Sequence, residues 1–412
     1  MTAQASAGPD PVSAETASRY ASLRLFAALV LSTIGSVGMW SFMVTLPAVQ
    51  ADFAVMRADA SLPFTLTMTG FALGGVLMGR LADRFGVMIP AVCGALGLGT
   101  GYVAAGHAAN LWQLAAAYGL IGIASSATFG PLMTDVSLWF TRRRGIAVAL
   151  AASGNYLAGA VWPPLVQHFI ATAGWRPTHI GIGLICVVTM LPLALVALRR
   201  KPPMRDDAPA PAAAGGQRAL GLSPNALQAL LIVAGIACCV AMAMPQVHIV
   251  AYCGDLGYGP ARGAEMLSLM MGFGIVSRLA SGVIADRIGG LATLLLGSVL
   301  QGVGLVLYLV FDSLASLYVI SALFGLFQGG IVAMYAIIVR EYFSPQEAGT
   351  RLGIVLMATL FGMALGGWMS GAIFDLSGSY RAAFANGLLW NLVNALITLW
   401  LLTRPGRRLA PA

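Results

Sequence analysis

The sequence predicts an all-α membrane protein with twelve transmembrane helices arranged as two six-helix bundles. Its 412 residues are 58% hydrophobic and only 9% charged. A soluble domain carries about 25% charged residues because its surface faces water. This chain has too few charged residues to cover the surface of a soluble protein. Apolar runs of about 20 residues recur along the whole chain, and each is long enough to cross a hydrocarbon core about 30 Å thick.

The twelve expected helices are separated by polar and Gly/Pro-rich positions. The first six are expected at residues 24–50, 61–80, 87–107, 111–138, 145–170 and 177–198. The second six are expected at residues 225–250, 263–284, 291–311, 314–340, 351–373 and 382–402. The chain therefore divides into two sets of six helices.

This division predicts five parts of the chain. They are an N-terminal tail (1–23), a first bundle (24–198), a linker (199–223), a second bundle (224–403) and a C-terminal tail (404–412). The linker is rich in Pro, Ala, Gly and charge. The N-terminal tail is polar, has no apolar stretch that would make it a signal peptide, and is expected to be disordered.

Basic residues are distributed unequally between the two sides of the expected helices. One side collects 18 of the 23 Lys and Arg residues, the other side collects four, and Arg278 lies within a span. Cytoplasmic loops of membrane proteins carry the excess of Lys and Arg. Both termini and the linker are therefore expected in the cytoplasm, in a multi-pass protein of the plasma (inner) membrane. The net charge of +8 is interpreted as this orientation signal and not as a nucleic-acid surface.

Three short motifs occur in the same order in both halves, at offsets of 203, 203 and 205 residues. The pairs are Gly79–Gly86 with Gly282–Gly289, Trp139–Phe140 with Tyr342–Phe343, and Trp175–Arg176 with Tyr380–Arg381. Such a repeat indicates two bundles related by an axis along the membrane normal, with a substrate path between them.

The segment Gly-Arg-Leu-Ala-Asp-Arg-Phe-Gly, at residues 79–86, resembles the loop signature of the major facilitator superfamily. Further stretches resemble the monocarboxylate porters and the oxalate–formate antiporter-like proteins of that superfamily. They are Trp139–Ala147, Pro163–Pro164 with Gly174–Arg176, Val247–Tyr252 and Arg278–Asp286. The resemblance implies two rocking bundles that transport a small carboxylate.

Arg278 is the principal candidate for substrate binding. It lies deep in the eighth expected helix, where an ionised Arg facing lipid would cost at least about 2.5–3.5 kcal/mol, so it should face a bundle interior or an aqueous cavity. Its guanidinium offers a fork of donors that matches a carboxylate. In the resembling family the matching Arg binds the substrate carboxylate. The alternative is an Arg held by an internal acid or by helix-end carbonyls, although the second half has no Asp or Glu at mid-membrane.

Five further side chains are candidates for the substrate site. His248, near the outer end of the seventh helix, can hold substrate or carry a proton because imidazole titrates near neutral pH; it can also be an ordinary interfacial residue. The amides of Asn155 and Gln328 lie at mid-membrane depth and can bond either to substrate or to a neighbouring helix. Trp40 and Tyr335 can line the cavity or serve as packing.

A group of charged residues is expected to form a gate on the cytoplasmic side, because a carboxylate after a helix can meet the positive N-terminus of the next one. The loop candidates are Asp83, Arg84, Asp286 and Arg287, and their expected partners are Asp135, the run Arg142–Arg144 and Glu341. In the resembling superfamily this loop latches the cytoplasmic side. The alternative is that these charges serve topology and solubility.

Departures from the resembling families narrow the expected substrate. The oxalate exchanger type carries a Lys on its eleventh helix, where Thr359 occupies the nearest matching position. Animal monocarboxylate carriers have an Asp four residues before the Arg of helix 8, where this chain has Gly274, and a Lys on helix 1, whereas no intramembrane Lys is expected here. One buried cation suits a monocarboxylate better than a dianion. The missing Asp also removes the carboxylate on which a proton relay of the animal type would depend.

The sequence therefore predicts a secondary active transporter of a small monocarboxylate, lactate- or pyruvate-like, working by proton-coupled symport with alternating access. An antiporter of organic anions or drugs on the same fold is the alternative, and a membrane receptor or enzyme is a remote one. The sequence contains no P-loop, zinc helix or nucleophile elbow, so no enzymatic activity, catalytic residue, metal or cofactor is expected. The expected partners are the carboxylate, a proton and membrane lipid, without nucleic acid, and the protein is expected to be a monomer.

Overall fold

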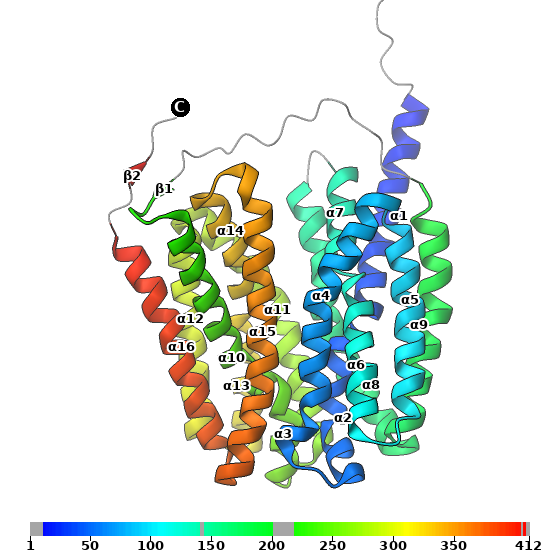
Figure 1. The fold of residues 1–412 in the computed structure, drawn as a ribbon, viewed down its shortest axis with the longest axis vertical. Helices are drawn as coiled ribbons and strands as arrows, with labels where there is room; N and C mark the ends of the chain where they lie inside the picture. The colour runs from blue at the N-terminus through cyan, green and yellow to red at the C-terminus, as the bar shows by residue number, and fades with distance from the viewer. Residues whose placement is uncertain (1–10, 141–143, 201–217, 405–406, 409–412) are drawn as a thin grey trace, which may run out of the picture.

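The computed structural model describes residues 11–140, 144–200, 218–404 and 407–408. Twelve helical segments in this part of the chain are long and apolar enough to cross a membrane, which confirms the expected all-α architecture. Figure 1 shows these segments running up and down the molecule in two groups that stand side by side.

The first half of the chain contributes nine helices. They are α1 (Pro11–Gly35), α2 (Val37–Phe53), α3 (Arg57–Ala60), α4 (Leu62–Phe85), α5 (Met88–Gly106), α6 (Leu111–Ser126), α7 (Gly130–Trp139), α8 (Arg144–Ala173) and α9 (Trp175–Ala197). Three spans are built from two helices each, α1 with α2, α3 with α4, and α6 with α7.

The second half has seven helices and two short strands. They are β1 (Arg218–Ala219), α10 (Pro224–Asp255), α11 (Pro260–Ile288), α12 (Gly290–Val310), α13 (Leu314–Gln328), α14 (Ile331–Tyr342), α15 (Pro345–Ser377), α16 (Tyr380–Thr403) and β2 (Arg407–Arg408). The strands pair antiparallel, with Arg218 opposite Arg408. Helices α13 and α14 together make the tenth span.

Several helix ends lie a few residues beyond their expected positions. The seventh span continues to Asp255 instead of ending at residue 250, because helix ends depend on capping as well as on hydrophobicity. At the start of α10, for example, the Ser223 side chain accepts a hydrogen bond from the Ala226 N–H.

The first helix differs most from its prediction. Helix α1 begins at Pro11, inside the tail predicted as disordered, and Pro at a first helical position already has the backbone angle of a helix. The tail residues 1–10, the linker residues 201–217 and residues 405–406 and 409–412 of the C-terminal tail lie outside the described residues.

The two halves repeat the same helix ending after their second spans. Gly86 follows α4 with a φ of +83°, and Gly289 follows α11 with a φ of +86°. In each case the glycine N–H donates to the carbonyl oxygen four residues earlier, on Ala82 or Ala285, at 2.8 Å. A positive φ favours glycine because a side chain would collide with the backbone. The spacing of 203 residues between these glycines therefore corresponds to a repeated structure.

Each half packs mainly against itself. In the first half α4 lies on α6 and α5 on α9, and in the second half α10 lies on α15 and α12 on α16. The two halves meet where α8 contacts α11, where α15 contacts α3 and α4, and where α2 contacts α10.

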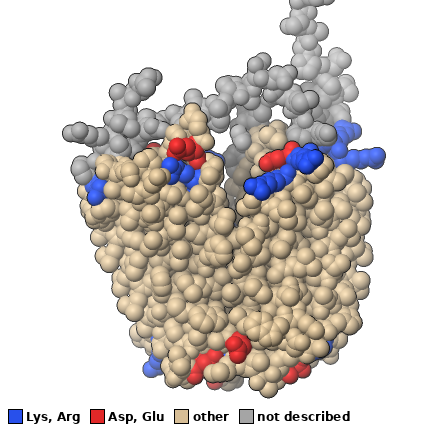
Figure 2. Space-filling model, in the orientation of Figure 1, with Lys and Arg blue, Asp and Glu red and all other residues tan. Residues whose placement is uncertain are grey.

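We call the end of the molecule that carries the start of α1 and the end of α16 the terminal end, and the opposite end, which carries α3, the distal end (Figure 1). On the face drawn in Figure 2, Lys, Arg, Asp and Glu gather at the two ends, and the band between them is uncharged. Exposed apolar side chains lie along the spans of both halves, among them Leu73 of α4, Val188 of α9, Val319 of α13 and Leu396 of α16. Such a band is the surface that a spanning protein presents to lipid.

The halves are joined at the distal end and separated at the terminal end. Hydrogen bonds join the halves at two levels. At mid-depth, Arg278 of α11 bonds to Ala152 of α8, and at the distal end Arg57 bonds to Asp255. Figure 2 shows a furrow between the halves that opens at the terminal end.

Candidate functional site

Arg278 lies at mid-depth where the two halves meet. It projects from α11 toward α8, and its Nη1 donates to the Ala152 carbonyl oxygen at 3.4 Å. Its guanidinium carbon lies 4.6 Å from the centre of the Tyr156 ring. Ala152 and Tyr156 are four residues apart on α8 and therefore present one face of that helix to Arg278.

The charge of Arg278 has no counter-ion in the part of the chain that the structure describes. None of the ion pairs found there includes it. Its Nε is buried and has no hydrogen-bond partner among the described residues. A buried donor without a partner costs about 1–3 kcal/mol, so this group is suited to a ligand that brings an acceptor.

Tyr156 connects this site to the second half. Its hydroxyl donates to the Gly329 carbonyl oxygen at 3.0 Å, at the break between α13 and α14. The structure therefore places an aromatic ring of the first half between Arg278 and the broken tenth span. Sequence reasoning did not select Tyr156, although it directly follows the candidate Asn155.

Trp40 and Asn155 lie together beside Tyr156. The Trp40 Nε1 donates to the Asn155 carbonyl oxygen at 3.0 Å. The Asn155 amide in turn donates to the Ser36 hydroxyl at 3.3 Å. Ser36 stands at the break between α1 and α2, so Asn155 joins two helices of the first half. Its role as a substrate ligand stays a prediction.

Gln328 and Tyr335 are both buried in the second half. Gln328 immediately precedes Gly329 and is 1% exposed, and neither atom of its amide has a hydrogen-bond partner within the described residues. Tyr335 instead donates to Asn394 Oδ1 at 3.2 Å, inside the second half. Gln328 therefore has bonding capacity left for a ligand or a water, whereas the Tyr335 hydroxyl is already occupied.

His248 is fully buried near the distal end, with both ring nitrogens bonded. Its Nε2 lies 2.8 Å from the Gly367 carbonyl oxygen, which can only accept, so Nε2 carries the proton. Its Nδ1 then accepts from the Tyr380 hydroxyl at 3.1 Å. Tyr380 itself accepts from Arg57 Nη1 at 2.8 Å. His248 is thus the inner end of a hydrogen-bonded chain that crosses between the halves.

Arg57 closes the distal end. It pairs with Asp255 at the end of α10 and lies 4.2 Å from the centre of the Phe374 ring. The carboxylate of Asp375 accepts hydrogen bonds from the backbone N–H groups of Arg57 and Ala58, at 2.9 and 2.7 Å. Sequence reasoning counted Arg57 only as a loop charge, because its partners are about 200 and 320 residues away along the chain.

The loop residues expected to form a gate are exposed at the terminal end. They are Asp83, Arg84, Asp286 and Arg287. Within residues 11–140, 144–200 and 218–404 none of them makes an ion pair. Of their expected partners, Arg142 and Arg143 lie outside the described residues, and the Arg144 side chain is not described. Their gating role stays a prediction.

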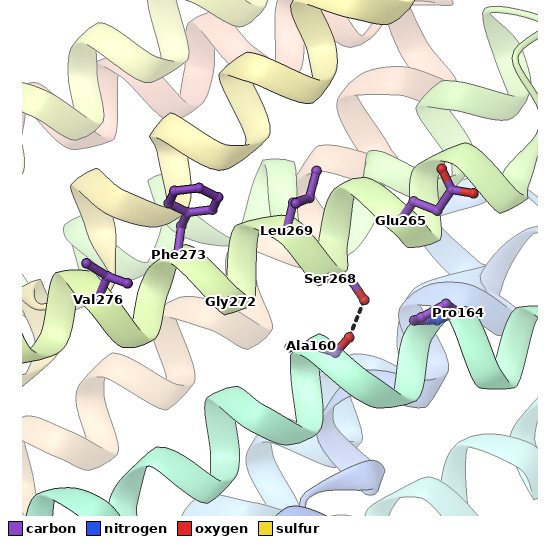
Figure 3. Close-up of a pocket in the computed structure, with 8 residues that line it drawn as sticks. All are labelled: Ala160, Pro164, Glu265, Ser268, Leu269, Gly272, Phe273 and Val276. Carbon is purple, nitrogen blue, oxygen red and sulfur yellow. Dashed lines mark hydrogen bonds between the residues drawn. The ribbon is translucent and has the colours of Figure 1, made fainter.

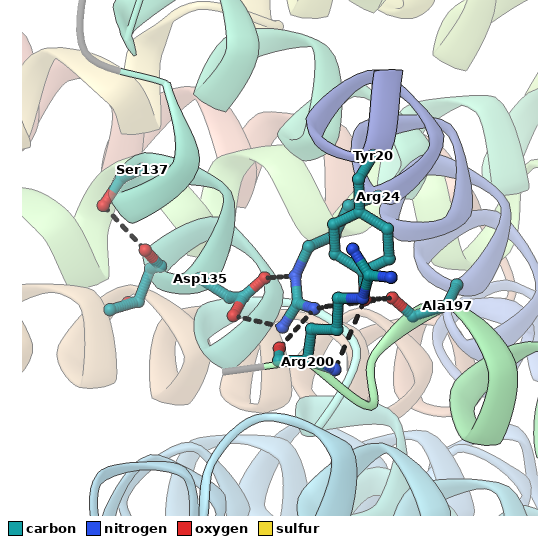
Figure 4. Close-up of polar contacts among 7 residues, drawn as sticks. Tyr20, Arg24, Asp135, Ser137, Ala197 and Arg200 are labelled. Carbon is teal, nitrogen blue, oxygen red and sulfur yellow. Dashed lines mark hydrogen bonds and ion pairs between the residues drawn. The ribbon is translucent and has the colours of Figure 1, made fainter. Parts of the chain in front are cut away.

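Asp135 has a different partner from the expected one. Figure 4 shows it facing Arg24 of α1, whose Nε and Nη2 donate to its two oxygens at 2.6 and 2.8 Å. Arg24 Nη1 also donates to the Arg200 carbonyl oxygen at 2.8 Å. The sequence could not indicate this pair, because the two residues are 111 positions apart.

Glu341, expected as a gate partner in the second half, lies at the start of a helix, and its gating role stays a prediction. Its side chain accepts a hydrogen bond from the Gly290 N–H, the first residue of α12, at 3.1 Å. A negative charge at this position is stabilised by the helix dipole. Glu341 therefore joins the end of α14 to the start of α12 within the second half.

A groove of about 470 Å³ runs along the outer side of the contact between α8 and α11. Figure 3 shows Ser268 bonded to the Ala160 carbonyl oxygen at its floor, with Glu265 toward one end. Leu269, Phe273 and Val276 line the groove and are exposed. It is mainly apolar, as a surface facing lipid should be.

The described residues contain no group of three or more His, Cys, Asp and Glu side chains that could hold a metal ion. The site at Arg278 offers the hydrogen-bond donors and positive charge of the guanidinium and the aromatic face of Tyr156. Such a set suits the binding of an anion and contains no nucleophile with an adjacent base.

Comparison with known proteins identifies one family. The family model described as Major Facilitator Superfamily matches residues 28–300 and 255–411. Monocarboxylate transporter 13 of Rattus norvegicus is 30% identical over 389 residues, covering 90% of this chain and 86% of the rat protein. An agnestins efflux protein of Paecilomyces divaricatus is 23% identical, covering 97% of this chain and 91% of its own length.

Two solved structures share the fold. One is a bacterial homologue of the human lysosomal transporter Spinster in an inward-facing and occupied conformation, with a TM-score of 0.73 and 13% identity over 97% of this chain and 98% of that one. The other is the nucleoside transporter NupG, with a TM-score of 0.72 and 14% identity over 92% of this chain and 99% of that one. At these identities the similarity extends to the fold alone.

Proposed function

The chain belongs to the major facilitator superfamily, and from this premise we propose that it transports a small monocarboxylate, with Arg278 as the anion site. The observation that carries the proposal is the Arg278 guanidinium at the contact between the halves, which pairs with no carboxylate and whose buried Nε has no partner among the described residues. A carboxylate accepts from two guanidinium nitrogens at once, which would satisfy that donor and neutralise the charge.

The number of charges favours a monocarboxylate over a dianion. At the position matching the second cation of the oxalate exchanger type, the Thr359 side chain is 4% exposed and bonds to the Leu356 carbonyl oxygen of its own helix at 2.7 Å. One cation at the site balances one carboxylate. The similarity to monocarboxylate transporter 13 supports the same substrate class.

The transport cycle would be alternating access between the bundles 24–198 and 224–403. The excess of Arg at the terminal end favours placing that end in the cytoplasm of the plasma membrane. The conformation described here would then be open to the inside and closed to the outside by Arg57. In the opposite conformation, Asp83, Arg84, Asp286 and Arg287 would close the inner side.

A proton carried with the substrate would make the step electroneutral. A monocarboxylate bound to Arg278 leaves the loaded site neutral, and a proton moving in the same direction cancels the charge of the anion. Arg278 has no acidic neighbour within the described residues, so no internal carboxylate competes with the substrate for the cation, and the co-transported proton balances the charge of the substrate itself.

The proposal is tested by uptake of labelled lactate, pyruvate and acetate into proteoliposomes under an imposed pH gradient, with wild type and Arg278 variants. A charge-assisted contact contributes about 1.5–3 kcal/mol, so Arg278→Ala should weaken binding at least about tenfold. Arg278→Lys keeps the charge but not the planar fork, and should weaken binding nearly as strongly. Arg262→Ala removes an exposed charge from the same helix and serves as the control. Wild-type affinity in Arg278→Ala would place the anion site elsewhere.

A second candidate function is export of an organic anion or drug in exchange for protons. It is favoured by the similarity to fungal transporters, one of which is named as an efflux protein. The two functions differ in one measurement on the same vesicles. Exchange predicts proton flux only when substrate is present on the opposite side, whereas symport predicts flux with substrate on the proton side alone.

A further inference from the structure

We propose that Tyr156 is the positioning residue of the anion site: its ring supports the Arg278 guanidinium from the opposite half, and its hydroxyl ties that support to the closed distal end. The inference rests on the proposed function and adds a residue and a coupling that the function alone does not require. It starts from three contacts that converge on one side chain.

The first contact is the one between ring and cation. The guanidinium carbon lies 4.6 Å from the ring centre, within the range in which an aromatic face attracts a cation. Tyr156 belongs to α8 of the first half and Arg278 to α11 of the second. An aromatic face steadies a cation without neutralising it, unlike a carboxylate. The full charge of Arg278 therefore remains available for an anion on the other side of the guanidinium plane.

The second contact excludes a side chain from the position one helical turn before Arg278. A Cβ at Gly274 would lie 2.5 Å from Cε1 and 2.7 Å from Cδ1 of the Tyr156 ring. Real Cβ atoms do not approach ring carbons so closely, so the ring needs glycine at this position. The space beside Arg278 that a side chain at position 274 would fill is therefore occupied by the Tyr156 ring of the other half.

The third contact is the hydroxyl. It donates to the Gly329 carbonyl oxygen at 3.0 Å, and Gly329 itself packs on the Gly274 backbone. Gly329 stands between α13 and α14, where a carbonyl is not used by a continuous helix. Separation of the halves at this depth would break this bond and withdraw the ring from Arg278 together. The two contacts can nevertheless be removed one at a time by substitution. Loss of the ring should lower the affinity for the anion, and loss of the hydroxyl should shift the conformational equilibrium.

The test compares Tyr156→Phe and Tyr156→Leu in purified protein. Binding of L-lactate and pyruvate is measured by calorimetry. Distal opening is measured without ligand, as the rate of maleimide labelling of A364C in a Cys93→Ser background. Ala364 is 3% exposed, and its carbonyl oxygen accepts from Thr65 of the other half, whereas Cys93 is the exposed native cysteine. Tyr308→Phe, which removes a buried hydroxyl bonded to Ser321 inside the second half, is the matched control.

We expect Tyr156→Leu to weaken acid binding about tenfold, in keeping with a cation–π contact in a desolvated site. Tyr156→Phe should bind within about twofold of wild type and label several times faster, because one hydrogen bond between the halves is lost. Tyr308→Phe should change neither value. If Tyr156→Leu does not fold, Tyr156→Met, which also lacks a ring, takes its place.

The outcomes separate this inference from the proposed function. If wild type binds neither acid, the proposed function and this inference fall together. If wild type binds and Tyr156→Leu binds equally well, Tyr156 does not position Arg278 and the inference alone is overturned. Unchanged labelling in Tyr156→Phe would overturn the coupling of the hydroxyl to the closed distal end.

Discussion

Arg24 and Arg57 are two buried arginines with similar surroundings and different positions in the molecule. Each pairs with an aspartate, and each lies against aromatic rings, Arg24 at 4.9 Å from the Trp139 ring centre and Arg57 at 4.2 Å from that of Phe374. They are 1% and 7% exposed. The chemistry of the two clusters is therefore nearly the same.

What differs is the side of the molecule to which the partners belong. Arg24 bonds to Asp135, Tyr20 and the carbonyl oxygens of Ala197 and Arg200, which all belong to the first half or its end. Its cluster therefore holds one bundle together at the terminal end (Figure 4).

Arg57 belongs to the first half, but it pairs with Asp255, bonds to Tyr380 and stacks on Phe374 of the second half. In its own half, the Arg57 side chain donates to Gln50 at 2.9 Å. A cluster of this composition that lies within one half stabilises the fold of that bundle. The same kind of cluster across both halves stabilises the conformation in which the distal end is closed.

The largest expected effect is on the stability of the first half. Arg24→Met leaves Asp135 buried without its counter-charge, and the free energy of unfolding should fall by about 3–5 kcal/mol. Denaturant titration of the purified protein in detergent measures the change. The double variant Arg24→Met with Asp135→Leu should recover most of the loss, because an apolar pair of similar volume is often neutral. Equal stability of wild type and Arg24→Met would show that the ion pair between Arg24 and Asp135 does not stabilise the first half.

Arg57→Ala should act on conformation more than on stability. Without Arg57 the distal end loses an ion pair and a bond to Tyr380, so the distal-open conformation should become more populated. Two such contacts are worth about 1–3 kcal/mol, which corresponds to a labelling rate of A364C raised about tenfold. The same rate in the variant as in wild type would show that the distal end is held by other contacts.

Asp83→Asn should shift the same equilibrium in the opposite direction. The exposed loop after α4 is proposed to close the inner side only when the distal end is open. Removing its charge should therefore disfavour the distal-open conformation and slow A364C labelling about two- to fivefold, the effect of a partly exposed charge contact. Asp59→Asn, which removes a carboxylate from α3 that forms none of the distal contacts described here, is the control. Faster labelling in Asp83→Asn would contradict the proposed gate.

The smallest effect is expected at Arg381, which follows Tyr380 in the repeated motif. Its guanidinium lies 3.5 Å from Asp312, and both side chains are more than half exposed, at 68% and 57%. Exposed pairs contribute about 0–1 kcal/mol. Arg381→Ala should therefore leave both the unfolding free energy and the labelling rate close to wild type. A large change in either value would mean that an exposed ion pair can hold the distal end as the buried Arg57 pair is expected to do.

The architecture could be derived from local features of the sequence. Twelve apolar segments, the polar segments between them and the repeated Gly86 and Gly289 depend on residues close together in the chain, so composition and spacing are enough to identify them. The interior position of Arg278 followed from the cost of exposing a guanidinium to lipid. Loop charges such as Asp83 could be placed at an end of the molecule, although not paired.

The partners of the buried charges required the assembled fold. Arg57 and Asp255 are 198 residues apart, and Arg24 and Asp135 are 111 apart, so no local pattern relates them. The sequence shows Arg57 as one of a few basic residues on the sparsely charged side, and it shows Gly274 only as a missing acid. The packing of α8 on α11 explains why glycine stands at position 274, because the Tyr156 ring of the other half occupies the space that a side chain would fill. Pairings of this kind depend on how helices far apart in the chain are oriented toward each other, and that orientation comes from packing the whole bundle.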